Sequence, residues 1–304
     1  MMSHVYIEKD DFRQSLIIAK NEIIKSVRGK RFLAAAILTA IVWALITIVP
    51  FFTSRGWDDM TLGDMLSSYL LYAYMMVILI VGLVGSVALV SEYEERTALI
   101  LFTRPVKKTT IFLGKFVSSF VLSALLMIGY YVGVIVMTLI YHQTVPSNLF
   151  FSYIMSCCFI VAATGISFIF SAVMKKSSVC IIFTILAIMV VIPIITKMMS
   201  GDTWYMLTTA ADSILTCVPE YVDTYNATVN DMYVALDKIY EAISTSTDPM
   251  TRSYAPFIKE FTAMMGSFMS PIAHPDLFKE AAVMLVWGIG ASVVAWILFL
   301  RREF

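Results

Sequence analysis

Six long, uncharged apolar runs constrain the fold of this chain more than any other feature. Each is about 20 residues long or longer, enough for a helix to cross the roughly 30 Å hydrocarbon core of a bilayer. Hydrophobic residues make up 59% of the chain and charged residues only 14%, against about a quarter in soluble domains. None of the runs contains Asp, Glu, Lys, Arg or His. We therefore predict an all-α membrane protein whose six transmembrane helices cover residues 32–53, 67–90, 116–141, 149–174, 178–196 and 281–300.

Basic residues are distributed unevenly between the two sides of this predicted bundle. Lys and Arg in short loops are retained in the cytoplasm. The side that holds both ends of the chain carries sixteen of the 22 basic residues, and the other side carries six, spread over more residues. We expect a multi-pass protein of a prokaryotic cell membrane with both termini in the cytoplasm. The first run follows about thirty polar and amphipathic residues, unlike a cleaved signal peptide, so we expect the N-terminus to be retained.

The segment before the first run has the periodicity of an amphipathic helix. Apolar residues recur at steps of three and four, the spacing of one helical face, at Phe12, Leu16, Ala19, Ile23 and Val27. Most basic residues of the segment lie off that stripe. This pattern predicts an N-terminal cytoplasmic interfacial helix. The alternative is a basic flank that only orients the first span.

The region between the fifth and sixth runs is too long for a turn. Residues 200–279 hold ten acidic and four basic residues, which suits an outward-facing segment and argues against nucleic acid as a partner. Apolar residues at steps of three and four predict an amphipathic helix with a seam, at Tyr225, Val229, Met232, Leu236, Ile239 and Ile243. A second apolar stripe follows at residues 261–269. We predict a helical external region that returns to the membrane surface, with a mobile loop as the alternative.

These patterns divide the chain into four parts. Residues 1–31 form the interfacial (elbow) helix, and residues 32–199 form spans one to five with a charged segment at 91–115. Residues 200–279 form the extracytoplasmic helical region, and residues 280–304 form the sixth span and cytoplasmic tail.

The chain lacks the motifs of a motor or an enzyme. Neither Gly29-Lys30 nor Gly114-Lys115 has the preceding glycine of a phosphate-binding P-loop. All three histidines lie outside the runs, and no His-Glu-x-x-His sequence occurs. No Cys/His spacing suggests zinc, and the methionines near His274 are more typical of apolar packing than of a metal site. We expect a non-catalytic chain, without a metal or cofactor of its own, that takes its energy from another protein.

The charged segment and the start of the chain carry short elements in a distinctive order. Residues 91–115 contain acids and a threonine (Glu92, Glu94, Glu95, Thr97), then Thr103-Arg104-Pro105-Val106 and Gly114-Lys115. Upstream stand Ala19-Lys20-Asn21-Glu22 and Lys30-Arg31-Phe32. With six spans in this order, most of the chain resembles the ABC-2 type permease family, the membrane subunits of ATP-binding-cassette exporters. Arg96, in place of a common glycine, and Lys107-Lys108, in place of a Ser-Arg pair, depart from the family pattern, and the external region is longer.

The resemblance implies partners and a site of energy input. A second permease chain, identical or different, would pair with this one above two cytoplasmic ABC ATPase subunits, which would bind ATP and Mg. The ATPase would couple to the chain through Glu92, Glu94, Glu95, Arg96, Thr97, Arg104 and Pro105. Acids near a helix start are stabilised by its dipole and proline interrupts the backbone, so these residue types suit a docking segment. A loop that only orients the spans is the alternative.

The same resemblance places the translocation path between the second and fifth spans of the paired permeases. Polar and conformationally special residues of these spans are candidates for its lining: Tyr69, Tyr72, Tyr74, Thr184 and Pro193. Because the spans hold no charge, we predict export of a hydrophobic or amphipathic substrate.

Two functions of other kinds compete with this one. The first is a non-transporting polytopic membrane protein, a receptor or assembly factor, that acts through its acidic external helices. The second is a gradient-driven carrier, which is disfavoured because such carriers usually need ionisable groups near the membrane midplane. Membrane lipid is an expected partner under every alternative.

Overall fold

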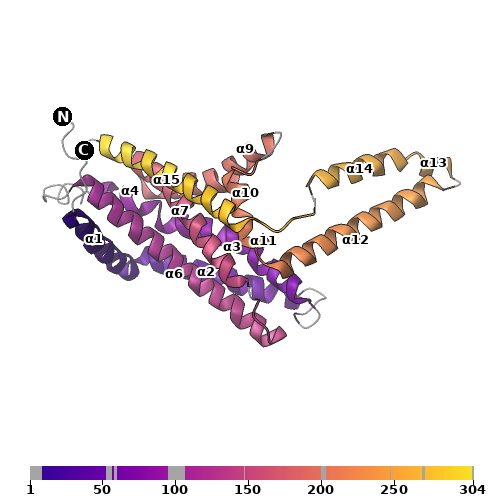
Figure 1. Ribbon diagram of the computed structural model, residues 1–304, viewed down its shortest axis with the longest axis horizontal. Coiled ribbons are helices and arrows are strands. Elements are labelled where there is room, and N and C mark those ends of the chain that lie inside the picture. Colours follow the sequence, from indigo (N-terminus) through magenta and orange to yellow (C-terminus); the bar gives the residue numbers. More distant parts are fainter. Residues whose placement is uncertain are drawn as a thin grey trace.

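The protein is a bundle of long helices with a helical hairpin at one end (Figure 1). The structure is a computed structural model that describes residues 9–52, 57, 60–94, 107–146, 148–199, 203–246, 248–268 and 271–302. All regular elements among these residues are helices. Six helical stretches in the described part are long and apolar enough to span a membrane: Phe32–Pro50, Leu62–Glu94, Lys108–His142, Leu149–Val173, Ser177–Met198 and Leu277–Arg301. The prediction of an all-α membrane protein with six spans is confirmed.

Several helices extend beyond the uncharged runs that predict them. α2 covers Lys30–Phe52, α6 covers Lys108–His142 and α15 covers Leu277–Arg301, whereas α7 (Leu149–Val173) stays within its run. α6 therefore includes Lys115, which the run at 116–141 leaves out. Helical hydrogen bonding continues into the polar flanks because no proline interrupts it there.

Two of the spans are interrupted. The second consists of α3 (Leu62–Val84) and α4 (Val87–Glu94), separated at Gly85 and Ser86, where the Ser86 hydroxyl donates to the Gly82 carbonyl. Such back-bonding bends helices. The fifth consists of α8 (Ser177–Leu186), a π-helical turn at Ala187–Val191, and α9 (Ile192–Met198). Pro193 follows that turn directly and has no N–H to donate, which accounts for the wider hydrogen-bonding pattern before it.

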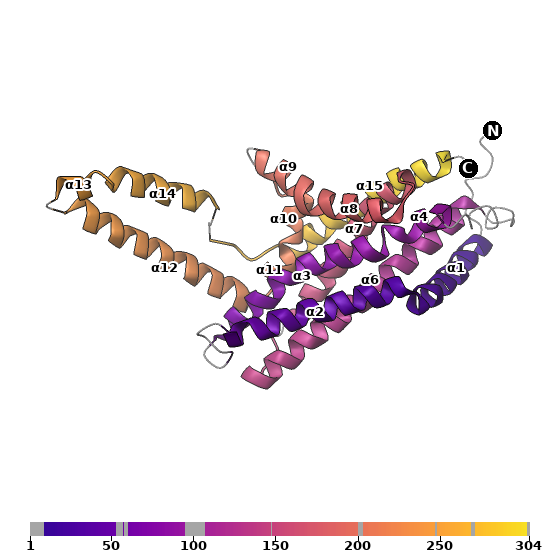
Figure 2. The ribbon, with the colours of Figure 1, turned by 180° about the vertical axis from the view of Figure 1, so that it is seen from behind.

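α1 covers Lys9–Arg28 and lies along α6 (Figure 2). Its contact with the bundle is made by small and polar residues, since Ser15 and Ala19 are buried. The predicted apolar stripe largely stays outside: the exposed fractions of Phe12, Leu16 and Val27 are 63%, 48% and 48%. The predicted helix is present, and its exposed stripe suits a position in the membrane interface.

The hairpin consists of α12 (Pro219–Ser244), α13 (Pro249–Arg252) and α14 (Ala255–Phe268). α14 packs against α12, and along the predicted seam of α12 Val229 is buried whereas Ile239 is 46% exposed. Both views show the hairpin leaving the end of the bundle opposite to α1 and to the C-terminal end of α15. We call these the hairpin end and the α1 end. Asn226 of α12 binds the segment that follows α14: it accepts a hydrogen bond from Ile272 N and donates one to Ile272 O.

Not all of residues 200–279 lie in the hairpin. α10 (Leu207–Ala211) and α11 (Ser213–Thr216) pack against the bundle helices α7, α3 and α15. Ala210, Ile214 and Val218 are fully buried there. Their apolar run is too short to predict as a span, yet it fills the space between α7 and the base of α12. The first part of the predicted external region therefore contributes to the core of the bundle.

Candidate functional site around α4

α4 is the last described helix before the segment that the sequence assigns to ATPase coupling. Two of the seven predicted coupling residues, Glu92 and Glu94, lie in α4. The other five lie outside the described residues: Glu95, Arg96, Thr97, Arg104 and Pro105. The site can therefore be built from α4 and from Lys107, where the described chain resumes.

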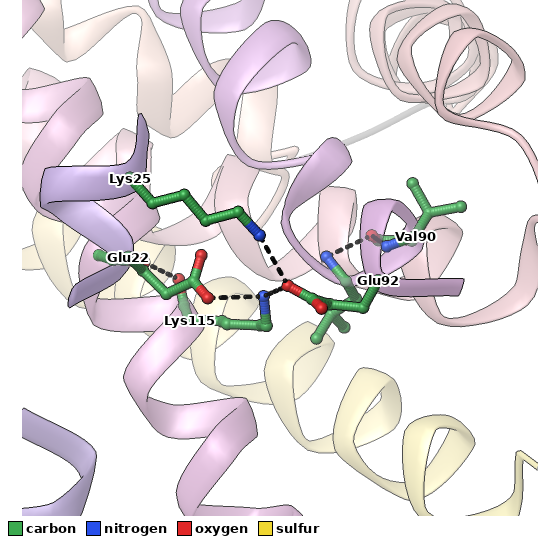
Figure 3. A network of polar contacts seen from close by, with 8 residues as sticks. Glu22, Lys25, Val90, Glu92 and Lys115 are labelled. Atoms are coloured by element: carbon green, nitrogen blue, oxygen red, sulfur yellow. Dashed lines mark hydrogen bonds and ion pairs between the residues drawn. The ribbon is translucent and has the colours of Figure 1, made fainter. Parts of the chain in front are cut away.

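Glu92 lies in a cluster of ion pairs that joins three helices (Figure 3). One of its oxygens, Oε1, is 3.0 Å from Lys115 Nζ of α6 and 3.2 Å from Lys25 Nζ of α1. Lys115 Nζ is also 3.2 Å from Glu22 Oε1 of α1. The Lys115 side chain is only 2% exposed and that of Glu92 only 10%. Glu92 therefore pairs with two lysines of this chain, and it connects α4 to α1 and α6.

Charges alternate in this cluster in the order Lys25, Glu92, Lys115, Glu22. Each of the two most buried groups, Glu92 and Lys115, has two neighbours of opposite sign. Removing one member of a buried pair leaves an uncompensated charge and typically costs about 3–5 kcal/mol. The cluster therefore strongly favours one position of α1 on the bundle.

The Gly114-Lys115 pair has a physical role in this contact. A Cβ on Gly114 would lie 2.8 Å from Ile18 Cγ2 and 2.9 Å from Ser15 O, so only glycine lets α1 approach this closely. The next residue, Lys115, then reaches the two carboxylates. In the sequence this pair stands out only as an incomplete P-loop and through the family resemblance; neither predicts Lys25 and Lys115 as partners of Glu92, nor Glu22 as a partner of Lys115. The sequence feature that could have indicated a buried lysine is the position of Lys115, which directly precedes the apolar run at 116–141 and continues its helix.

Glu94 connects the other side of α4 to the fifth span. Its Oε2 accepts hydrogen bonds from the Ser177 hydroxyl and, at 3.2 Å, from Ser177 N, at the start of α8. A carboxylate is favourable at a helix N-terminus because it satisfies free N–H groups and opposes the helix dipole. Whether Glu92 and Glu94 also contact another protein stays a prediction.

The backbone of α4 is fixed to α7. Ser171 Oγ of α7 accepts hydrogen bonds from Leu89 N and Val90 N, at 3.2 and 3.0 Å. These N–H groups belong to the first turn of α4, where no carbonyl of the same helix is available to them.

Arg302, at the end of α15, completes the set of contacts. Its guanidinium donates to the last carbonyls of α7, with distances of 3.2 Å to Ser171 O, 2.9 Å to Ala172 O and 2.9 Å to Met174 O. The same group lies 3.8 Å from the ring centroid of Tyr93 in α4. α4 is therefore connected by polar contacts to α1, α6, α7, α8 and the end of α15, and we call it the α4 hub.

The far end of the segment is also tied to α1. Lys107, the first residue described after position 106, has its Nζ 2.7 Å from Asp11 Oδ2. The two described parts of the chain that flank positions 95–106, α4 and Lys107, therefore both contact α1.

The five predicted path residues do not form one surface in this chain. Tyr69 is fully buried, its hydroxyl lies 2.9 Å from Thr47 Oγ1, and its ring stacks on Trp57. Thr184 is also fully buried, whereas Tyr72 is 45% exposed. Tyr74 is half-buried and stacked on Phe159, and Pro193 is half-buried in α9. Their assignment to a translocation path stays a prediction.

Comparison with known proteins supplies the identity of the family. In the described part of the chain, no group of three or more His, Cys, Asp and Glu is placed to hold a metal ion. No curated protein matches the chain. The model of one family, described as ABC-2 family transporter protein, matches residues 16–304, which include the α4 hub and all six spans. The chain therefore belongs to the ABC-2 transporter family.

Proposed function

We propose that a separate cytoplasmic ATPase drives this ABC transporter permease by moving the α4 hub. The observation that carries the proposal is the position of α4, which directly precedes residues 95–106 and has polar contacts with four other helices and Arg302. A displacement of α4 would be transmitted to the fifth span through the contact of Glu94 with Ser177, and to α1 and α6 through the ion pairs of Glu92. The resemblance supports the same segment as the point of ATPase contact.

The break between α3 and α4 gives this movement a place to occur. Gly85 and Ser86 separate the two helices, so α4 can tilt without bending the buried part of α3. Alternating access in such proteins requires the helices to rock between two packings. Under the proposal, ATP and Mg bind to the ATPase subunits, and this chain converts their closure into that rocking.

A second permease chain would cover the fifth span. Only 22% of the most apolar stretch of Ser177–Met198 is buried within this chain, against 67% for Leu62–Glu94; the first span, Phe32–Pro50, is as exposed (17% buried), and the family resemblance selects the fifth. Large apolar side chains are exposed along this span, including Ile182, Phe183, Leu186, Val190 and Ile194. The surface is uncharged up to Lys197, which supports a path for a hydrophobic or amphipathic substrate. The basic residues of the α1 end support a cytoplasmic location for it.

The test combines co-purification with a charge reversal in the coupling segment. The tagged chain, expressed in its native host, should co-purify with an ABC ATPase. In the reconstituted complex, Glu95→Arg should lower ATP hydrolysis at least several-fold while the melting temperature of the permease stays unchanged. Asp237→Arg, on exposed α12, is the matched control and should leave hydrolysis unchanged.

Two results would contradict the proposal. One is the absence of any ATPase in the purified material, and the other is normal ATP hydrolysis with Glu95→Arg. The first result would favour the non-transporting alternative, in which the hairpin contacts a partner.

A further inference from the structure

We propose that a groove at the α1 end of the bundle binds a phospholipid whose headgroup carries both a phosphate and a primary ammonium group. The inference concerns the lipid-facing side of the molecule and does not depend on an ATPase partner. It rests on the shape of the groove, the separation of its polar and apolar ends, and the charges at its polar end.

The groove lies between α1, α6, α7 and α15 and encloses about 380 Å³. Most of its wall is apolar and comes from membrane-spanning helices: Phe112, Leu113, Phe116, Val161, Ile289 and Val293. Phe112 of the groove wall packs against the rings of Phe168 and Phe299, with centroids 5.4 and 6.0 Å from its own. This packing fixes the position of Phe112 in the wall, because buried aromatic rings fix one another's positions.

The open side of the groove faces the bilayer. Leu113, Val293 and Ile289 line it and are 37%, 46% and 62% exposed. These residues belong to helices that span the membrane, so the surrounding medium at this depth is lipid hydrocarbon. Lipid acyl chains are therefore the apolar groups present at the highest concentration around the groove.

The polar end of the groove is formed by α1 and by the start of α6. Lys107 Nζ and Asp11 Oδ2, both from groove-lining residues, are 2.7 Å apart. The Lys107 side chain remains 39% exposed. Trp296 donates its indole N–H towards Thr109 Oγ1, at 3.4 Å, close to this end. Tryptophan is enriched at the boundary between hydrocarbon and headgroups, which matches a lipid lying with its headgroup here.

The ion pair at this end distinguishes between headgroups. A cation and an anion side by side are complementary to a headgroup that carries phosphate and ammonium side by side: Lys107 donates to the phosphate, and the ammonium donates to Asp11. A purely anionic headgroup would place its charge against Asp11. A choline headgroup has no N–H to donate to that carboxylate.

Quenching of Trp296 fluorescence by acyl-brominated phospholipids tests the proposal. The full-length chain is reconstituted in nanodiscs, and the part of the quenching that Trp296→Phe abolishes is taken as the groove signal. Val293→Phe should fill the groove and reduce this signal by more than half. Val294→Phe is the matched control, because Val294 is 48% exposed on the same helix but does not line the groove.

Headgroup preference is measured by competition with unlabelled lipid. Phosphatidylethanolamine should displace the brominated lipid at several-fold lower mole fraction than phosphatidylglycerol or phosphatidylcholine. Asp11→Asn should remove the preference over phosphatidylcholine while leaving quenching in place. Equal effects of the two valine variants, no Trp296-dependent quenching, or equal competition by all three lipids would each overturn the proposal.

Discussion

At the scale of single residues, the buried Lys115 ammonium holds two carboxylates from different helices. Lys115→Met would remove the buried cation that lies between the Glu92 and Glu22 carboxylates, and the half-exposed Lys25 would remain beside Glu92. We expect a loss of about 3–5 kcal/mol in the free energy of unfolding, seen as a lower melting temperature in detergent. Lys20→Met, on the exposed side of α1, should change it by no more than about 0.5 kcal/mol.

A double-mutant cycle separates the ion pair from other effects of the substitution. Because the cluster couples the two groups, Glu92→Gln combined with Lys115→Met should cost less than the sum of the single variants, by at least about 1 kcal/mol. Strict additivity, or a Lys115→Met variant as stable as Lys20→Met, would show that the pair does not hold α1 in place.

Two glycines of α6 provide a matched comparison for helix approach. At Gly114 an added Cβ would meet Ile18 and the Ser15 carbonyl within 2.9 Å, whereas at Gly129 nothing lies within 4 Å. Gly114→Ala should therefore destabilise the protein by roughly 1–3 kcal/mol, because α1 must move away from α6. Gly129→Ala should be neutral or stabilise it by up to about 1 kcal/mol, since alanine favours the helix. Thermal unfolding measures both, and equal responses would contradict the close packing of α1.

At the scale of elements, Arg302 joins α15, α7 and α4. Lysine at this position keeps the charge but cannot reproduce the planar set of donors that reaches three carbonyls and covers the Tyr93 ring. We expect Arg302→Lys to lower the free energy of unfolding by roughly 1–3 kcal/mol. The exposed neighbour Arg301 is the control, and Arg301→Lys should have little effect. Melting curves of the two variants test this, and indistinguishable curves would contradict the role of Arg302.

At the scale of the whole molecule, the arrangement of the two ends predicts an orientation. α1 and the end of α15 lie together, and the hairpin lies at the opposite end. In a variant with the four native cysteines replaced, Asp237→Cys on α12 should react with a membrane-impermeant maleimide in intact cells. Lys20→Cys on α1 should react only after permeabilisation. The reverse pattern would overturn the orientation predicted from the basic residues.

Much of the fold is predictable because a membrane-spanning helix is specified locally. Each helix satisfies its own backbone hydrogen bonds, so hydropathy over about 20 residues indicates it without knowledge of its neighbours. The same holds for α1 and for the seam of α12, whose periodicity lies within one helix. The burial of α10 and α11 was not predictable in this way, because it depends on the space left between α7 and the base of α12.

The sequence by itself determined the class of protein, the six spans and the presence of acids immediately after the second apolar run. The tertiary structure decided what the acids in α4 do within the chain. Glu92 meets Lys25 and Lys115, which are 67 and 23 residues away, and Glu94 meets Ser177, which is 83 residues away. Which neighbouring carboxylate faces a buried lysine depends on the rotation of α4 and on how closely Gly114 lets α1 approach. Those are properties of packing between helices, and no local pattern encodes them.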